Sequence, residues 1–351
     1  PPPSTASAKT RIALLLPLSG GAAPIGQALQ QAAEMALFDT GARELALAAY
    51  DSGETADTAV EAYRKARTDG VALVLGPLFG TSATALAPLV AQGGANVVSF
   101  SNDEQAAQRG VWIMGIPAPP QVRRVVDHAV DAGIRRFAAF APQTSYGQQM
   151  VQTLESQVTI RGGRVAAVEL FDPNSADLNT PARRLAEASR GEDRLAVLVP
   201  VAPPRLSAAL AALAAAGVDN KSVQLIGTGV WDVPNIGSEV MLRGAWYAAP
   251  DPAKRADFER RFLSTYGRPP HRLATLAYDG VSLAGHLARL KQGGDFSAEA
   301  ITNPNGWSGI DGIFRFLPNG RSERALAVIA VQAGPGQVVS PAPTNFQRPV
   351  N

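Results

Sequence analysis

Residues 71–82 read Val-Ala-Leu-Val-Leu-Gly-Pro-Leu-Phe-Gly-Thr-Ser, a continuous apolar run followed by a turn that carries glycine and proline. The run has the length of a strand, and strands that are apolar on both faces are typical of parallel sheets, because helices cover both sides of such sheets. A helical stretch follows at residues 82–92 and another short apolar strand at 96–99. This stretch therefore predicts a βαβ unit of a doubly wound α/β fold.

The same alternation extends along the chain in two runs. The first run comprises strands at residues 11–16, 45–50, 71–75, 96–99 and 111–114, with helices at 25–38, 55–69 and 82–92. The second comprises helices at 119–132, 145–161, 179–189 and 205–216, with strands at 136–141, 165–170, 195–199 and 223–226. Two runs of βα units predict two Rossmann-like, doubly wound lobes.

The last third of the chain breaks this alternation. Two successive helices are expected at residues 252–266 and 275–291, then a β-hairpin of residues 312–316 and 325–332 around the turn Asn319-Gly320. Residues 337–351 carry no periodicity and are expected to be extended. We predict lobe 1 at residues 9–117 plus 250–308, lobe 2 at 118–249 plus 309–340, an N-terminal tether at 1–8 and a C-terminal extension at 341–351.

Composition bounds the class of protein. The 351 residues are 46% hydrophobic and 18% charged, which fits a globular protein of about two domains. The formal net charge is +2, with acidic and basic residues interspersed, so nucleic acid is not an expected partner. No cysteine is present, which excludes disulfides and thiolate metal sites. The chain begins Pro-Pro-Pro-Ser-Thr-Ala-Ser-Ala without Met, so we expect a signal peptide or lipid anchor upstream.

Motifs of catalysis are not found in the sequence. It contains no H-E-x-x-H, G-x-S-x-G, P-loop or G-x-G-x-x-G pattern, and His128, His271 and His286 have no obvious nucleophile or metal ligand beside them. We therefore predict a binding protein with no catalytic residue, metal or cofactor. An enzyme on this scaffold stays the least favoured reading.

The order of several short motifs resembles the type I periplasmic binding protein superfamily. They are Leu16-Pro17-Leu18-Ser19-Gly20, Val74-Leu75-Gly76-Pro77-Leu78, Val97-Val98-Ser99-Phe100-Ser101-Asn102, Tyr146-Gly147, Ala277-Tyr278-Asp279-Gly280-Val281 and Gly309-Ile310-Asp311-Gly312-Ile313-Phe314-Arg315-Phe316. The resemblance covers nearly the whole chain. It implies a periplasmic receptor whose two lobes close on a small-molecule ligand in the cleft between them.

Two branches of that superfamily remain open. One is the branched-chain amino acid type of ABC-transporter receptor, whose partner is a membrane permease. The other is the penicillin-binding protein activator lipoproteins, whose partner is a peptidoglycan synthase and in which the cleft would be vestigial. Residues 76–78, 98–101 and 135–139 look closer to the activators.

Ligands of open α/β sheets bind beyond the carboxyl ends of the strands, where loops and helix N-termini converge. This rule, taken with the resemblance, gives a set of polar or glycine positions expected to bind a small polar or carboxylate ligand. They are Ser19, Gly80, Thr81, Ser82, Ser99, Ser101 and Asn102 in lobe 1, with Tyr146, Thr228 and Trp231 in lobe 2. Structural alternatives stand beside them: Ser82 as a helix cap, and Trp231 folded onto its own lobe.

Two departures from the resemblance bear on the ligand. Amino-acid receptors of the family place a hydroxyl residue where this chain has Gly80, although Thr81 follows directly. They also place an acidic residue after a late strand, where this chain has residues 227–231, Gly-Thr-Gly-Val-Trp. An ammonium group would lack its partner there. The resemblance therefore implies an incomplete clamp for an aliphatic amino acid.

Overall fold

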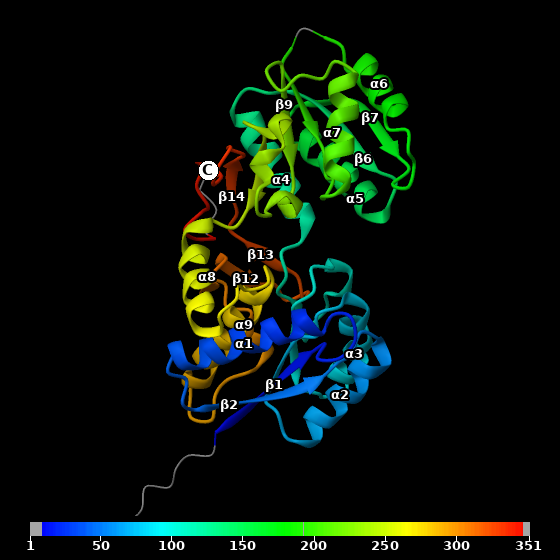
Figure 1. Cartoon of the computed structure of the whole chain (residues 1–351). Helices are drawn as coiled ribbons and strands as arrows, with labels where there is room; N and C mark the ends of the chain where they lie inside the picture. Colours follow the sequence, from blue (N-terminus) through cyan, green and yellow to red (C-terminus); the bar gives the residue numbers. More distant parts are fainter. Residues whose placement is uncertain (1–8, 192, 347–351) are drawn as a thin grey trace, which may run out of the picture. The chain divides into compact units, whose positions relative to one another are not determined.

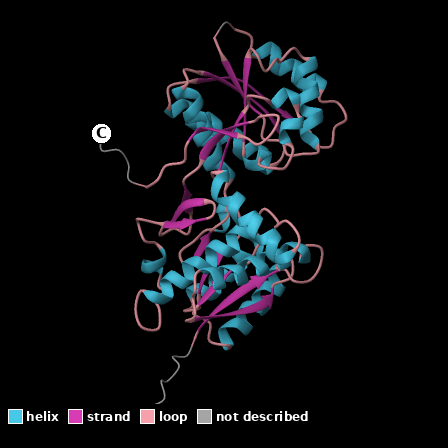
Figure 2. Cartoon of the chain, turned by 60° about the vertical axis from the view of Figure 1, so that its left-hand side comes forward, coloured by secondary structure: helices cyan, strands magenta, loops and turns pink. Residues whose placement is uncertain are grey.

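The computed structural model describes residues 9–191 and 193–346, so the predicted tether at residues 1–8 lies outside the described part. The chain divides into two compact units, each treated by itself below. Within the described residues, unit 1 comprises residues 9–117, 252–325 and 344–346, and unit 2 comprises residues 118–251 and 326–343. The last residues of the predicted C-terminal extension, 347–351, also lie outside the described part. Both contain a parallel sheet flanked by helices (Figure 2), which is the predicted α/β class.

Unit 1 is built on a five-stranded parallel sheet in the order β2-β1-β3-β4-β5. Its elements in chain order are β1 (Thr10–Leu16), α1 (Ala23–Asp39), β2 (Leu45–Asp51), α2 (Ala56–Thr68), β3 (Leu73–Leu75), α3 (Gly80–Ala91), β4 (Asn96–Ser99), η1 (Glu104–Ala106) and β5 (Val111–Ile113). Later segments add α8 (Pro252–Tyr266), α9 (Ala274–Arg289), α10 (Ala298–Ile301) and an antiparallel sheet of β11 (Trp307–Gly309), β12 (Gly312–Phe316) and β13 (Ser322–Arg324).

The central strand β1 shows why the run of apolar residues is unbroken. Ile12, Leu14 and Leu16 pack into a core with helices α1, α8 and α9, whereas Ala13 and Leu15 pack into a second core with α2 and α3. Both faces of the strand are therefore buried, as expected for a parallel sheet. Figure 1 shows α1, close to the blue start of the chain, beside the much later α9.

Unit 2 contains a seven-stranded sheet in the order β15-β14-β10-β9-β8-β6-β7. Its elements are α4 (Ala118–Asp131), β6 (Arg136–Pro142), α5 (Ser145–Ile160), β7 (Arg164–Phe171), α6 (Asn179–Ala188), β8 (Leu195–Leu198), α7 (Arg205–Ala215), β9 (Val223–Gly227), η2 (Gly229–Trp231), η3 (Ile236–Ser238), η4 (Val240–Leu242), β10 (Trp246–Ala249), β14 (Ala327–Ala330) and β15 (Gln337–Ser340). Strands β6 to β10 are parallel, and β14 and β15 are antiparallel to their neighbours.

The tail of the chain differs from the prediction in three ways. Residues 309–325 belong to unit 1 rather than lobe 2, because the aromatic side chains of β11 and β12 join the core around α9. β12 pairs with β13, not with residues 325–332, because its turn closes between Leu317 and Arg321, which places Ser322 opposite Phe316. Ala327–Ala330 is apolar on both faces and lies in the larger sheet.

Four strands were not anticipated from the sequence: β11 and β13 of the small antiparallel sheet, and β10 and β15 of the unit 2 sheet. β10 begins at Trp246 and continues the parallel sheet beyond β9. β15 lies within the segment expected to be extended and forms the edge of the unit 2 sheet by pairing with β14. An edge strand needs only one pairing face, so its sequence carries a weak pattern.

Candidate functional site

Each unit has a topological switch point at the carboxyl edge of its sheet. In unit 1 the strand order reverses between β1 and β3, and in unit 2 it reverses between β6 and β8. Loops that leave neighbouring strands in opposite directions open a crevice at such points, where ligands of doubly wound folds bind. The predicted site residues lie on or near these loops, which we take one unit at a time.

The loop between β1 and α1 is held by two carboxylates. Asp51 Oδ1 accepts hydrogen bonds from the backbone N–H groups of Leu18 and Gly53, each at 2.9 Å. The Ser19 hydroxyl also bonds Asp51, and this bond is the main reason that the pKa of Asp51 is lowered. Glu54 Oε1 accepts from Ala22 N at 2.6 Å, at the start of α1. Ser19 itself is exposed at this edge.

The N-terminus of α3 explains why residue 80 is glycine. A Cβ atom at Gly80 would lie 2.8 Å from Asp103 Cβ and Oδ2, so a larger residue would collide with that side chain. Asp103 Oδ1 in turn accepts from Gln105 N at 2.9 Å. The space that a side chain at residue 80 would need is therefore taken by the Asp103 side chain. Thr81, the next residue, is exposed.

Three of the predicted serines are buried, and their hydroxyls bond backbone groups of unit 1. Ser99 Oγ donates to Pro77 O at 2.8 Å, and Ser82 Oγ donates to Thr55 O at 3.3 Å. Ser101 Oγ accepts from Asp103 N at 3.0 Å. Ser82 does not cap α3, because the residue before that helix is Phe79, which provides no side-chain cap. Asn102, between these contacts, is exposed and open to solvent.

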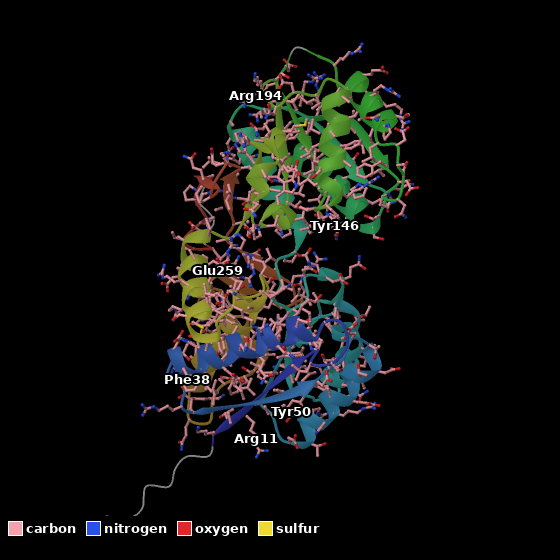
Figure 3. All side chains as sticks on the ribbon, in the orientation of Figure 1. Arg11, Phe38, Tyr50, Tyr146, Arg194 and Glu259 are labelled. Atoms are coloured by element: carbon pink, nitrogen blue, oxygen red, sulfur yellow. The ribbon has the colours of Figure 1, made fainter. Side chains whose placement is uncertain are left out.

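In unit 2 the structure joins two of the predicted residues directly. The Tyr146 hydroxyl, from the first turn of α5 (Figure 3), lies 2.8 Å from Thr228 Oγ1 at the end of β9. Thr228 is fully buried and Tyr146 is half-buried. Burial raises the pKa of Tyr146, so its hydroxyl stays neutral. The helix cap here is Thr144, whose Oγ1 accepts from Gly147 N.

Trp231 is fully buried within its own unit. Its Nε1 donates to Val201 O at 3.1 Å, and its ring centroid lies 6.5 Å from that of Tyr247. A Cβ atom at Gly227 would lie 2.5 Å from the Trp231 ring, so the glycine allows the strand end to approach the indole. The ring is therefore part of the unit 2 core, in agreement with the alternative that Trp231 folds onto its own lobe.

Gln121 belongs to this edge but was not anticipated. It is 5% exposed, and its Oε1 accepts from Gly229 N at 2.5 Å. Together with the contacts of Tyr146 and Trp231, this bond fixes the segment from Gly227 to Trp231 at three points. A glutamine on the buried face of α4 has no distinguishing spacing, so the sequence offered no signal for it.

Neither a metal cluster nor a membrane-spanning helix is found in the part of the chain that the structure describes. Two of the three histidines make edge-on ring contacts: His128 with Trp246 at 4.6 Å and His286 with Trp307 at 5.1 Å. Burial is the main reason that the pKa values of His128 and His271 are lowered. The carboxyl edges of the two sheets can therefore bind a ligand through hydrogen bonds and charge.

Comparisons with known proteins agree with this architecture. A family model described as periplasmic binding protein matches residues 9–335. A Rhodospirillum rubrum structure assigned to branched-chain amino acid ABC transport is 20% identical, with a TM-score of 0.84, and the match covers 94% of this chain and 100% of that one. A leucine-binding protein from Thermotoga maritima is 19% identical, with a TM-score of 0.66 and coverage of 94% and 98%.

A relative of lower coverage is an uncharacterised protein of Rickettsia prowazekii, 22% identical over 175 residues. The match spans 50% of this chain and 47% of that protein, so the chain accounts for about half of its relative's length. Nothing in the comparisons supports the second branch considered from the sequence, the penicillin-binding protein activators, or a lipid anchor. Because the family model covers most of the residues and both units have the expected topology, the chain belongs to the periplasmic binding protein family.

Proposed function

We propose that this protein is the solute-binding component of an ABC transporter and that it binds a small polar solute. The family implies a periplasmic location, a small-molecule ligand and a membrane permease as partner, and its members bind solutes rather than transform them. The observation that carries the proposal is the carboxyl edge of the unit 1 sheet. Exposed Ser19 and Asn102 follow β1 and β4 there, and exposed Thr81 lies in the first turn of α3, the helix after β3.

The charges at this edge favour one class of solute. Helix N-termini attract anions, but here Glu54 bonds the first residues before α1 and Asp103 lies against the start of α3. A carboxylate solute would meet two carboxylates of the protein at these positions and would be repelled. We therefore propose a solute whose recognised part is neutral or cationic, such as a polyol, an amide or an amine.

Unit 2 supports the same assignment with neutral groups. Tyr146 and Thr228 share one hydrogen bond, which leaves the Tyr146 hydroxyl able to accept or donate another. Trp231 takes no part in recognition in this proposal, since its ring is inside the core. Ser82, Ser99 and Ser101 use their hydroxyls to bond backbone groups of unit 1, and Gly80 provides room for Asp103.

The experiment is a thermal-shift screen with three solute classes: polyols and amides, amines, and carboxylates. We expect a neutral or cationic solute to raise Tm and to bind measurably in calorimetry. Thr81→Ala and Asn102→Ala should weaken that binding at least about tenfold, as expected for the loss of a hydrogen bond inside a site. The matched control is Thr68→Ala, at an exposed position on α2.

Two results would overturn the proposal. One is a Tm that no solute class changes, and the other is binding that the Thr81 and Asn102 variants leave intact. If only carboxylates bind in the screen, the protein is still a solute receptor, but the proposed preference for neutral or cationic solutes is wrong. Recovery of a peptidoglycan synthase from an envelope extract, with no solute bound, would favour the activator branch.

A further inference from the structure

The edge strand β2 of unit 1 differs from the other edges of the two larger sheets. Among the described residues, these sheets end in β2 and β5 and in β15 and β7. β5 and β15 have only three and four residues, and β7 carries Arg164 and Glu169 and pairs with β6 in an irregular register. β2 has seven residues in unbroken register with β1, and residues 45–50 include neither a charge nor a proline. Shortness, charge and bulges are the usual ways in which an edge avoids a partner strand, so β2 is open to one.

The backbone groups on the outer side of β2 have no partner in the described part of the chain. Ser52 N, directly after the strand, donates to Leu16 O at 2.8 Å, and this ladder bond shows that the even-numbered residues of β2 face β1. Because the direction of these groups alternates along a strand, Leu47 and Ala49 turn their N–H and C=O groups outward. The edge therefore presents a row of donors and acceptors that another strand can bond.

An apolar groove lies beside this edge, on the face of the sheet that α1 covers. Its volume is about 370 Å³, and its lining includes Leu37 and Phe38 of α1, Leu47 and Ala49 of β2, and Glu34. Phe38, at the end of α1 (Figure 3), is 83% exposed. A large exposed aromatic side chain beside an apolar groove is typical of an interaction surface.

A second copy of this chain fits the edge in antiparallel orientation. In a pairing centred on Ala48, Leu47 of each copy lies opposite Ala49 of the other, so the outward N–H and C=O groups of the two strands meet. Ala48 then faces its own counterpart on the two-fold axis, where the Cα atoms of such a pair approach to about 4.5 Å. Its small side chain permits that approach. Phe38 lies near the start of β2, so this pairing places it beside the Ala49 end of the groove in the other copy.

The charges at the two ends of β2 favour the same orientation. Arg43, just before the strand, is exposed, and its neighbour Glu44 is paired with Arg289 at 2.8 Å. Asp51 and Glu54, at the opposite end, are exposed carboxylates. Antiparallel pairing brings the basic end of each copy to the acidic end of the other, whereas parallel pairing would bring like charges together.

We propose that β2 is a homodimer interface, in which two copies pair these strands about Ala48 and bury Phe38 of each copy against the groove of the other. The occupant is a second copy because the strand is complementary to itself in backbone groups, side-chain size and charge. The two five-stranded sheets then form one continuous sheet across the axis. The proposal does not depend on the identity of the solute.

Cysteine cross-linking of the full chain tests the register. The chain has no cysteine, so Ala48→Cys places one thiol of each copy on the two-fold axis, at a separation that suits a disulfide. The matched control is Ala46→Cys, a half-buried position on the same face of the strand that lies opposite Tyr50 of the other copy. On oxidation, Ala48→Cys should give at least about tenfold more covalent dimer than the control, because pairing raises the local thiol concentration. Equal cross-linking of the two variants would overturn the proposed pairing.

Sedimentation equilibrium measures the association itself. The average mass of the wild type should rise with concentration toward that of a dimer, and Phe38→Ser and Ala49→Pro should each weaken association at least about tenfold. Proline at residue 49 removes an outward N–H and no bond to β1, and Ala49→Gly is its control because glycine keeps that N–H. Leu263→Ser, at an apolar position on α8 that is 48% exposed, is the control for Phe38. A wild type that stays monomeric at every concentration, with no cross-linking of Ala48→Cys, would overturn the proposal and favour a strand of another protein as the partner of β2.

Discussion

The carboxyl edges of the two sheets are fastened by different chemistry. In unit 1 the loops are held by Asp51 and Glu54, whose carboxylates accept hydrogen bonds from backbone N–H groups, and Asp103 lies against the start of α3. In unit 2 the corresponding loops are held by neutral groups: the Tyr146–Thr228 hydroxyl pair, the Gln121 amide and the Trp231 indole. The same topology therefore supports one ionic edge and one neutral edge.

The two units also differ in the charged groups that they bury. Among the residues that the structure describes, the buried carboxylates Asp279 and Asp311 both belong to unit 1. The buried Arg136 of unit 2 bonds backbone carbonyls of Ser189, Arg190 and Asp193 instead. The stability of unit 1 should therefore depend on pH and salt, whereas the stability of unit 2 should depend mainly on side-chain packing. The following substitutions are ways to test that contrast.

Trp231→Ala should have the largest effect. Truncation of a fully buried aromatic side chain costs about 3–5 kcal/mol of unfolding free energy, because the cavity adds to the lost burial. Urea unfolding monitored by circular dichroism measures it, with Trp231→Phe as a control that keeps most of the volume. A small loss of stability together with a lost response to solute would contradict the core assignment and return Trp231 to the recognition surface.

Asp279→Asn should change how stability depends on pH. Burial and the nearby charge of Asp311 raise the pKa of Asp279 from 3.8 to about 7, against the lowering effect of Arg324 and of the Ile310 and Asp311 N–H groups. Between these pKa values the folded state keeps a proton that the unfolded chain has released, so stability falls as pH rises from about 4 to about 7. The slope reaches about 1.4 kcal/mol per pH unit.

Asparagine retains an oxygen to accept from Ile310 N, a bond of 2.7 Å in the wild type, but it has no proton to lose. The variant curve should therefore be flatter over this range. Parallel curves for wild type and variant between pH 4.5 and pH 7.5 would contradict the raised pKa of Asp279. The comparison uses the difference between curves, so titrating groups that do not interact with Asp279 cancel.

The sequence predicted the repeated elements much better than the tail. Period and apolar runs locate β1 to β9, and the local signal is strongest where a strand is buried throughout, as in β3, β5 and β8. They could not assign β11 to β13 to a unit, since the aromatic side chains of that sheet are equally suited to either core. The pairing of β14 with β10 depends on the fold of a segment about 80 residues earlier.

The sequence indicates which edge of each sheet carries the candidate residues, because topology fixes the edge to which strand ends lead. Ser19 and Asn102 lie on loops after strands, and Thr81 and Tyr146 lie in the first turns of α3 and α5. That these residues bind a solute stays a prediction. Whether a hydroxyl side chain faces solvent or a carbonyl depends on neighbours distant in sequence, as with Ser82 and Thr55. The carboxylates that define the unit 1 edge were missed for the same reason.

Tyr146→Phe should cost about 1 kcal/mol, since it leaves the buried Thr228 hydroxyl without its partner. The companion variant is Thr228→Val, and the double variant removes both polar groups. We expect the double variant to lose less stability than the sum of the single losses, measured by urea unfolding. Strictly additive losses would mean that the two hydroxyls do not depend on one another.

Glu54→Gln should have the smallest effect on stability, about 0.5 kcal/mol, because the side chain is exposed and solvent screens its bond to Ala22 N. Glutamine keeps an acceptor oxygen and removes the charge. Glu61→Gln, an equal charge change at an exposed position on α2, is the control. The informative readout is selectivity: carboxylate solutes should raise the Tm of the Glu54 variant more than that of wild type or control. Equal responses in all three proteins would mean that the charge of Glu54 does not select the solute, and the ionic edge would then serve only to hold its loop.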